Sequence, residues 1–187
     1  MKKKIVYTDF QDVSIRGRVA FFSSYLEKII LTKNRRLEDW EVLLTEICQY
    51  TLSDRLDNWH EKMSEYLPES ILEDIPFKEK EIVYLSYKDY AYLQILYRNA
   101  EEEILYLIKQ IFYIGTIELY GGIGEKGFQS LLIIKEVLEY IKYNKLILPY
   151  LTDIESFQKF KFSIEYGLGS TFVREQIHSL SQEFDGF

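Results

Sequence analysis

Two residues of the sequence, Arg55 and His60, have the types and the spacing that could support catalysis. They stand in the segment Arg55-Leu56-Asp57-Asn58-Trp59-His60. An arginine can hold a phosphate group, and a histidine can move a proton to or from an attacking 2′-hydroxyl. The pair could therefore cleave RNA. The alternative interpretation is a surface His60 beside a tryptophan, Trp59, that belongs to the core.

The spacing of Arg55 and His60 resembles that of the all-helical HEPN ribonucleases. In those enzymes a polar residue usually follows the arginine, whereas Leu56 follows it here. Acidic residues that would repel an RNA backbone flank the pair: Asp54, Asp57, Glu61 and Glu65. We therefore keep a HEPN-like ribonuclease that uses Arg55 and His60 as an alternative, and predict that the chain is not an enzyme.

A glycine-rich segment at residues 122–127 matches the letters of the dinucleotide-binding motif G-x-G-x-x-G. That motif needs a strand just before it and a ribose-binding acid about 20 residues after it. The preceding residues, 104–119, have a helical period, and the acid would fall near Leu146, before Asp153. We predict a glycine-rich turn between two helices rather than a cofactor site.

The sequence offers no other set of residues with the spacing of a cofactor or metal site. Neither His60 nor His178 has a histidine or cysteine partner at ligand spacing. Cys48 is the only cysteine, and its apolar helical context indicates a buried thiol. We expect no small-molecule cofactor and no metal.

Hydrophobic periodicity indicates the elements that must position these residues. Apolar residues recur at helical spacing nearly throughout, which predicts an all-α fold. The expected helices cover residues 19–32, 38–50, 54–67, 86–98, 101–114 and 129–143, with Asp54 and Ser86 as N-caps. Residues 81–85 have the composition of a short strand, and the pattern weakens after Pro149. We predict a single helical-bundle-like domain, residues 1–187, of about six to eight helices with an irregular C-terminal segment, and the sequence leaves the structure of residues 158–187 open.

Composition and charge limit the classes of function. Of the 187 residues, 47% are apolar and 28% are charged, which excludes a disordered tail. The net charge is −7, divided between +6 in residues 1–36 and −13 in residues 37–187, and this acidic balance argues against a nucleic-acid binder. The first residues lack the apolar run of a signal peptide, and no window is apolar enough to cross a membrane. We therefore expect a cytoplasmic protein that binds neither nucleic acid nor membrane.

Acidic residues recur every four positions in the middle of the chain. This acidic strip consists of Asp54, Asp57, Glu61, Glu65, Glu69, Glu73 and Asp74. On a helix, Asp57, Glu61 and Glu65 would share the face opposite the apolar side chains. The strip is either an ordinary solvated face or a negative surface that stands in for phosphates and meets a basic partner.

Several short strings of residues resemble bacterial immunity proteins of polymorphic and contact-dependent toxin systems. The likeness covers about residues 15–150. The strings are Phe21-Phe22-Ser23-Ser24-Tyr25-Leu26, Lys33-Asn34-Arg35-Arg36, Trp40, Tyr50-Thr51, Leu56-Asp57-Asn58-Trp59, Glu65-Tyr66-Leu67-Pro68-Glu69-Ser70-Ile71-Leu72, Ile114-Gly115-Thr116, Glu118-Leu119-Tyr120 and Leu148-Pro149.

This resemblance implies a small, mainly helical, cytosolic protein that binds a cognate nuclease toxin and blocks its active site. Similar proteins are associated with ribonuclease toxins, and the EndoU-type fold is our candidate for the toxin. We expect a non-enzymatic inhibitor that covers a basic cleft with the acidic strip. Exposed members of the 16 tyrosines would serve as contact residues. A HEPN-like ribonuclease and a helical scaffold or regulator are the alternatives.

Overall fold

The chain forms helices joined by short loops in the computed structural model, which describes residues 4–147, 149, 154, 157, 161 and 167–171. The described residues contain seven α-helices, four short 3-10 helices and no strand, so the all-α prediction is confirmed. The α-helices are α1 (Ile15–Thr32), α2 (Glu41–Leu52), α3 (Leu56–Ser64), α4 (Pro68–Leu72), α5 (Tyr87–Arg98), α6 (Glu102–Thr116) and α7 (Phe128–Tyr143). The 3-10 helices are η1 (Tyr7–Phe10), η2 (Leu37–Trp40), η3 (Phe77–Glu79) and η4 (Glu125–Gly127). The C-terminal segment predicted to be irregular, including residues 158–187, lies almost wholly outside the described residues.

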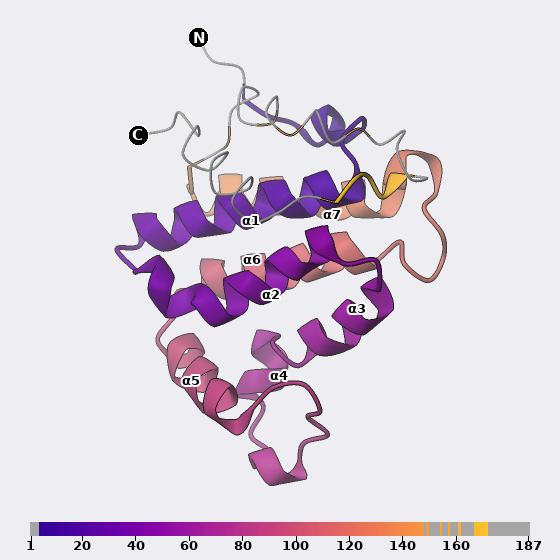
Figure 1. Cartoon of the computed structure of the whole chain (residues 1–187). Helices are drawn as coiled ribbons and strands as arrows, with labels where there is room; N and C mark the ends of the chain where they lie inside the picture. Colours follow the sequence, from indigo (N-terminus) through magenta and orange to yellow (C-terminus); the bar gives the residue numbers. More distant parts are fainter. Residues whose placement is uncertain are drawn as a thin grey trace.

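The helices α1 and α6 form the centre of the fold. α1 packs against α6 and α2, α6 also packs against α7, and α4 packs against α5. Figure 1 shows α1 and α7 toward one end, α2 and α6 in the middle, and α3, α4 and α5 at the other end. The region of the acidic strip therefore lies at the end of the molecule built from α3 and α4.

α1 begins at Ile15, whereas the apolar pattern predicted a start at Val19. Ser14 caps the helix, because its Oγ accepts the N–H of Gly17 at 3.1 Å. Arg16 and Arg18 interrupt the apolar pattern, yet they are only 1% and 0% exposed. A charged side chain at a buried position hides the start of a helix from an analysis based on hydrophobic periodicity.

Arg18 connects three segments of the chain from a fully buried position. Its guanidinium donates five hydrogen bonds of 2.6–3.1 Å. The acceptors are the carbonyl oxygens of Phe10, Val13, Lys126 and Gly127 and the hydroxyl of Ser130. Burial lowers the pKa of Arg18 to about 10, so the group is charged at neutral pH. The N-terminal residues and the start of α7 are thus bound to α1 through one side chain.

The glycine-rich segment forms a turn between α6 and α7, as predicted, and no strand precedes it. Gly122 and Gly127 have φ angles of +75° and +59°, which glycine adopts without steric cost. Buried Glu118 accepts the N–H of Ser130 at 3.1 Å and fixes the first turn of α7.

The helix predicted for residues 54–67 is present but shorter, since α3 covers Leu56–Ser64, and a separate helix, α4, follows at Pro68. Leu67 has an extended backbone (φ −65°, ψ 144°), which the residue before a proline prefers. Pro68 then starts α4 at a position where its missing N–H costs nothing. Asp54 is not the N-cap of α3, since Arg55 occupies that position and its side chain makes no capping bond.

Residues 73–86 form a loop that contains η3, and the strand predicted at 81–85 is absent. The carboxylate of Glu65 accepts the N–H groups of Val83, Tyr84 and Leu85 at 2.7, 2.9 and 2.8 Å. These main-chain donors are satisfied by a side chain, so they need no neighbouring strand. Ser86 caps α5 as predicted, and its Oγ accepts the N–H of Asp89 at 3.1 Å.

In the described part of the chain, five tyrosine hydroxyls bind main-chain carbonyl groups. The bonds are Tyr25 to Ile147, Tyr50 to Gly115, Tyr90 to Ile71, Tyr92 to Asp39 and Tyr97 to Tyr66, at 2.8–3.1 Å. Except for Tyr92, these tyrosines are buried. Each buried ring fills the core while its hydroxyl satisfies a carbonyl oxygen. Much of the tyrosine excess therefore has a structural role.

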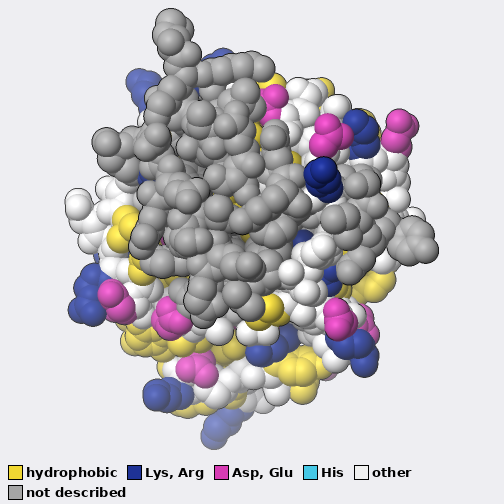
Figure 2. Space-filling view, turned by 45° about the horizontal axis from the view of Figure 1, so that its top comes forward, with side chains coloured by type: hydrophobic (Ala, Val, Ile, Leu, Met, Phe, Trp, Pro, Cys, Tyr) yellow, Lys and Arg dark blue, Asp and Glu magenta, His cyan; other side chains and the backbone are white. Residues whose placement is uncertain are grey.

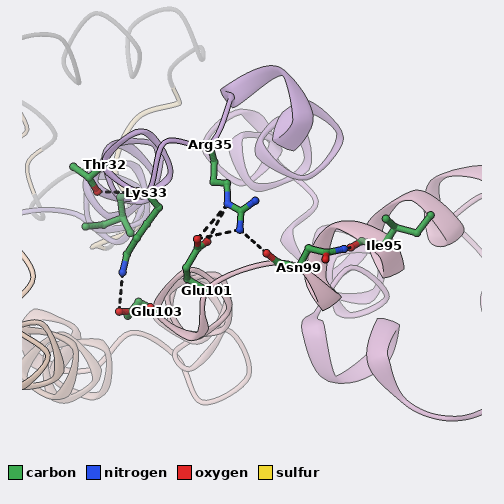
Figure 3. Close-up of polar contacts among 8 residues, drawn as sticks. Thr32, Lys33, Arg35, Ile95, Asn99, Glu101 and Glu103 are labelled. Carbon is green, nitrogen blue, oxygen red and sulfur yellow. Dashed lines mark hydrogen bonds and ion pairs between the residues drawn. The ribbon is translucent and has the colours of Figure 1, made fainter.

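The basic turn that follows α1 is bound to the junction of α5 and α6 (Figure 3). Arg35 donates to the carboxylate of Glu101 at 3.0–3.3 Å and to the carbonyl of Asn99 at 2.6 Å. Lys33 pairs with Glu103 at 2.9 Å. Part of the positive charge of residues 1–36 is therefore neutralised within the molecule.

We predict that Arg18→Met destabilises the fold by about 3–5 kcal/mol, because the substitution leaves buried acceptors without a donor. Urea denaturation followed by circular dichroism measures the change. The control is Arg36→Ala, which removes an ion pair with Glu38 whose side chains are 73% and 74% exposed. That control should cost at most about 1 kcal/mol. Equal stability of the Arg18→Met variant and the unmodified protein would contradict the role assigned to Arg18.

Candidate protein-binding surface

α3 is a short amphipathic helix whose apolar side is fixed against α2 and α6. Trp59 and Met63 are buried, and Nε1 of Trp59 donates to the carbonyl of Glu46 in α2 at 2.8 Å. The Trp59 ring also packs on Phe112 of α6, with ring centroids 5.9 Å apart. Because these contacts orient the helix, its opposite side faces solvent.

The solvent side of α3 carries two carboxylates and a histidine. Asp57, His60 and Glu61 are spaced three and four residues apart, so they share one side of the helix. Asp57 accepts hydrogen bonds from Arg55 at 3.0 and 3.2 Å, and these bonds hold the pKa of Asp57 below its usual value. Asp57 and Glu61 are both exposed.

Tyr84 reaches Glu61 from the 73–86 loop. Its hydroxyl donates to Oε2 of Glu61 at 3.0 Å, and the residue is 45% exposed. The hydrogen bond to this carboxylate raises the pKa of Tyr84, because a negative neighbour disfavours the phenolate. The hydroxyl therefore remains a donor at neutral pH.

Tyr120 reaches His60 from the segment that follows α6. Its hydroxyl lies 3.0 Å from Nδ1 of His60, and its ring stands edge-on to the imidazole. The other contact of the imidazole is with Phe112, on which it stacks with centroids 5.3 Å apart. Tyr120 itself is 73% exposed. We call the set Asp57, His60, Glu61, Tyr84 and Tyr120 the α3 surface.

Glu65 belongs to the acidic strip, but its carboxylate is occupied by the main chain. Both oxygens accept N–H groups of residues 83–85. Three such donors partly neutralise a carboxylate, so Glu65 holds the loop and presents less charge to solvent. The loop bonds of Glu61 and Glu65 place Tyr84 over α3.

The remaining acidic residues of the strip divide into paired and unpaired groups. Glu69 pairs with Lys109 at 3.1 Å and Glu73 pairs with Lys80 at 3.0 Å. Asp54 and Asp74 are exposed, and neither forms an ion pair within the described part of the chain. The four-residue spacing therefore does not produce a continuous row of free carboxylates.

Two acidic residues at the same end, Glu79 and Glu81, are absent from the predicted strip. Both are exposed and unpaired among the residues that the structure describes. With Glu65 and Glu73 they line a cavity of about 330 Å³. Residues 73–85 have no regular period, so sequence reasoning could not assign them to a face. The mixed charge of residues 73–85 was the only sequence feature that indicated an exposed segment.

The structure gives Arg55 and His60 different surroundings. Arg55 donates to Asp57 and Asn58 and lines a cavity of about 310 Å³ between α2 and α3. His60 instead contacts Phe112 of α6 and Tyr120. The contacts thus direct the two side chains toward different neighbouring elements.

Charges of both signs are mixed on the face that Figure 2 presents. This view brings the end with α1 and α7 forward, and Lys or Arg side chains lie beside Asp or Glu side chains around its described rim. No single sign of charge dominates that rim. This distribution contrasts with the unpaired carboxylates near α3.

The described residues contain no group of histidine, cysteine and acidic side chains that could hold a metal ion. Cys48 is buried, as predicted. None of the helices in the described ranges has the length and apolar character that crossing a bilayer requires.

Comparison with protein-family models, curated proteins and solved structures finds no match to this chain.

We predict that Glu65→Gln accelerates amide hydrogen exchange at Val83, Tyr84 and Leu85. A glutamine side chain has one oxygen acceptor in place of two, and its NH2 group opposes a main-chain donor. Hydrogen bonds to a charged group contribute about 1.5–3 kcal/mol, so the acceleration should be roughly tenfold or more.

Exchange is measured by NMR, with Glu69→Gln as the control, because that substitution affects an exposed ion pair with Lys109. Unchanged protection of the three amides in Glu65→Gln would show that the carboxylate does not hold the loop.

Proposed function

We propose that this chain is a non-enzymatic immunity protein that binds a cognate nuclease toxin and covers its active site. The toxin is a ribonuclease, and the EndoU-type fold is our specific candidate. The resemblance of residues 15–150 to bacterial immunity proteins is the first support. A nuclease must attract phosphate groups to its active site, so a protein that presents carboxylates can compete for it.

The observation that carries the proposal is the set of acidic side chains at the end built from α3, α4 and the 73–86 loop. Residues 54–89 contain ten acidic and five basic residues. Asp54, Asp74, Glu79 and Glu81 are exposed and lack an ion-pair partner in the described ranges. Unpaired charges attract a basic partner at a distance and accelerate the encounter.

The surroundings of Arg55 and His60 support a role without catalysis. General acid–base catalysis needs both groups directed at one phosphate. Arg55 is engaged by Asp57 and Asn58, whereas His60 is engaged by Tyr120 and stacked on Phe112. We therefore expect the purified protein and a His60→Ala variant to leave RNA intact. Cleavage by the unmodified protein that His60→Ala abolishes would favour the HEPN-like alternative.

We predict that replacing Asp74, Glu79 and Glu81 together by lysine weakens binding to the toxin by about tenfold or more at low ionic strength. The dependence of affinity on salt should also become flatter, because fewer charges attract the partner. Isothermal titration calorimetry measures both effects. The partner is an inactivated nuclease domain encoded by the neighbouring gene, which should also co-purify with this chain.

A matched control replaces Glu125, Glu136 and Glu139 by lysine. These residues are exposed on η4 and α7, so the total charge changes by the same amount at a different place. Equal losses in both triple variants would mean that only net charge matters. Failure of the unmodified chain to bind the neighbouring nuclease would overturn the proposed function itself.

A further inference from the structure

We propose that Tyr84 and Tyr120 are the two anchor residues with which the α3 surface holds a basic protein partner. This inference rests on the proposed function and names the part of the chain that makes the central contact. The two tyrosines come from distant segments, the 73–86 loop and the residues after α6. Both nevertheless bind side chains of α3, Glu61 and His60.

Tyr84 is fixed in place at both its hydroxyl and its main chain. The hydroxyl donates to Glu61 at 3.0 Å, and the main-chain N–H donates to Glu65 at 2.9 Å. Tyr84 is nevertheless 45% exposed. A side chain held in this way loses little conformational freedom when a partner binds.

Tyr120 is fixed through an aromatic stack that begins in the core. Phe112 is buried, the imidazole of His60 lies on Phe112, and the Tyr120 ring meets the imidazole edge-on at 5.4 Å between centroids. The hydroxyl of Tyr120 adds a hydrogen bond with Nδ1 of His60. At 73% exposure, Tyr120 still offers most of its ring to a partner.

The two tyrosines border α3 on its two sides. His60, the contact of Tyr120, faces α6, since it stacks on Phe112. Tyr84 lines the cavity between α2 and α3. Asp57 and Glu61 lie between them on the helix. The α3 surface therefore places carboxylates between two aromatic rings.

This arrangement suits a partner that presents arginine or lysine side chains. Their cationic groups can pair with Glu61, which forms no ion pair among the described residues, and their aliphatic stems and charges can pack on the tyrosine rings. Tyrosine is also enriched among the residues that contribute most to protein–protein binding. The Glu61 carboxylate between two exposed rings, at an acidic end of the molecule, therefore fits a basic protein surface.

The test measures binding of an inactivated form of the neighbouring nuclease to Tyr84→Ala, Tyr120→Ala and the double variant. We expect each single substitution to weaken binding about tenfold and the double substitution about 100-fold. Tyr84→Phe and Tyr120→Phe, which keep the rings, should weaken binding less than the alanine variants do. Tyr143→Ala is the control, because Tyr143 is 85% exposed at the end of α7, a helix that Figure 1 shows toward the opposite end of the molecule from α3.

The outcomes separate this inference from the proposed function. Binding of the double variant with unchanged affinity, while the lysine triple variant at Asp74, Glu79 and Glu81 binds weakly, overturns the anchor role alone. An equal loss for Tyr143→Ala also overturns it. No binding by the unmodified chain overturns both proposals. The unfolding temperature of each variant is compared with that of the unmodified protein, and we expect no change because these positions are exposed.

Discussion

The fold depends on a positive charge held where water does not reach it. A buried guanidinium is tolerated only if each of its donors finds an acceptor. Arg18 meets this condition with oxygen atoms from residues 10–13 and 126–130, so these segments must be in place for α1 to be buried. Arg16 joins α1 to the end of α2 and to Gly169, because its guanidinium donates to the carbonyls of Ser53 and Gly169 at 2.8 and 2.6 Å. Because α1 packs against α2 and α6, the bonds of these two arginines fix the neighbouring segments around the centre of the molecule.

The end of the molecule that carries the α3 surface is held by a different set of interactions. Trp59 fixes α3 to α2, while the hydroxyls of Tyr90 and Tyr97 in α5 bind carbonyl groups at Ile71 and Tyr66. Such bonds join short helices that could not be stable alone, since helices of this length gain their stability from packing. They provide the rigid support that an exposed contact residue needs. Binding through a prepared surface avoids the entropy cost of ordering it.

The helices were largely predictable, because their apolar residues follow the helical period and Ser86 carries a recognisable cap. The errors arose where a distant group determines local structure. The start of α1 was missed because Arg16 and Arg18 are polar yet buried. The prediction of a strand at 81–85 was wrong because the carboxylate of Glu65 accepts the main-chain N–H groups of residues 83–85. The four-residue spacing of the acidic residues predicted that Asp57 and Glu61 share the solvent side of a helix. It could not show that Lys109 of α6 would pair with Glu69, or that Tyr84 and Tyr120 would meet α3.

The bonds of Glu65 have an evolutionary consequence. Its carboxylate binds N–H groups of the main chain, and these groups are the same whatever side chains residues 83–85 carry, proline excepted. Mutations at the exposed positions 83 and 84 can therefore alter the surface of the loop while its backbone path is conserved, whereas Leu85 belongs to the core. For the proposed immunity role, this separation would allow new contact residues to arise without loss of the fold. Among homologues, Glu65 should vary more slowly than the exposed residues it supports.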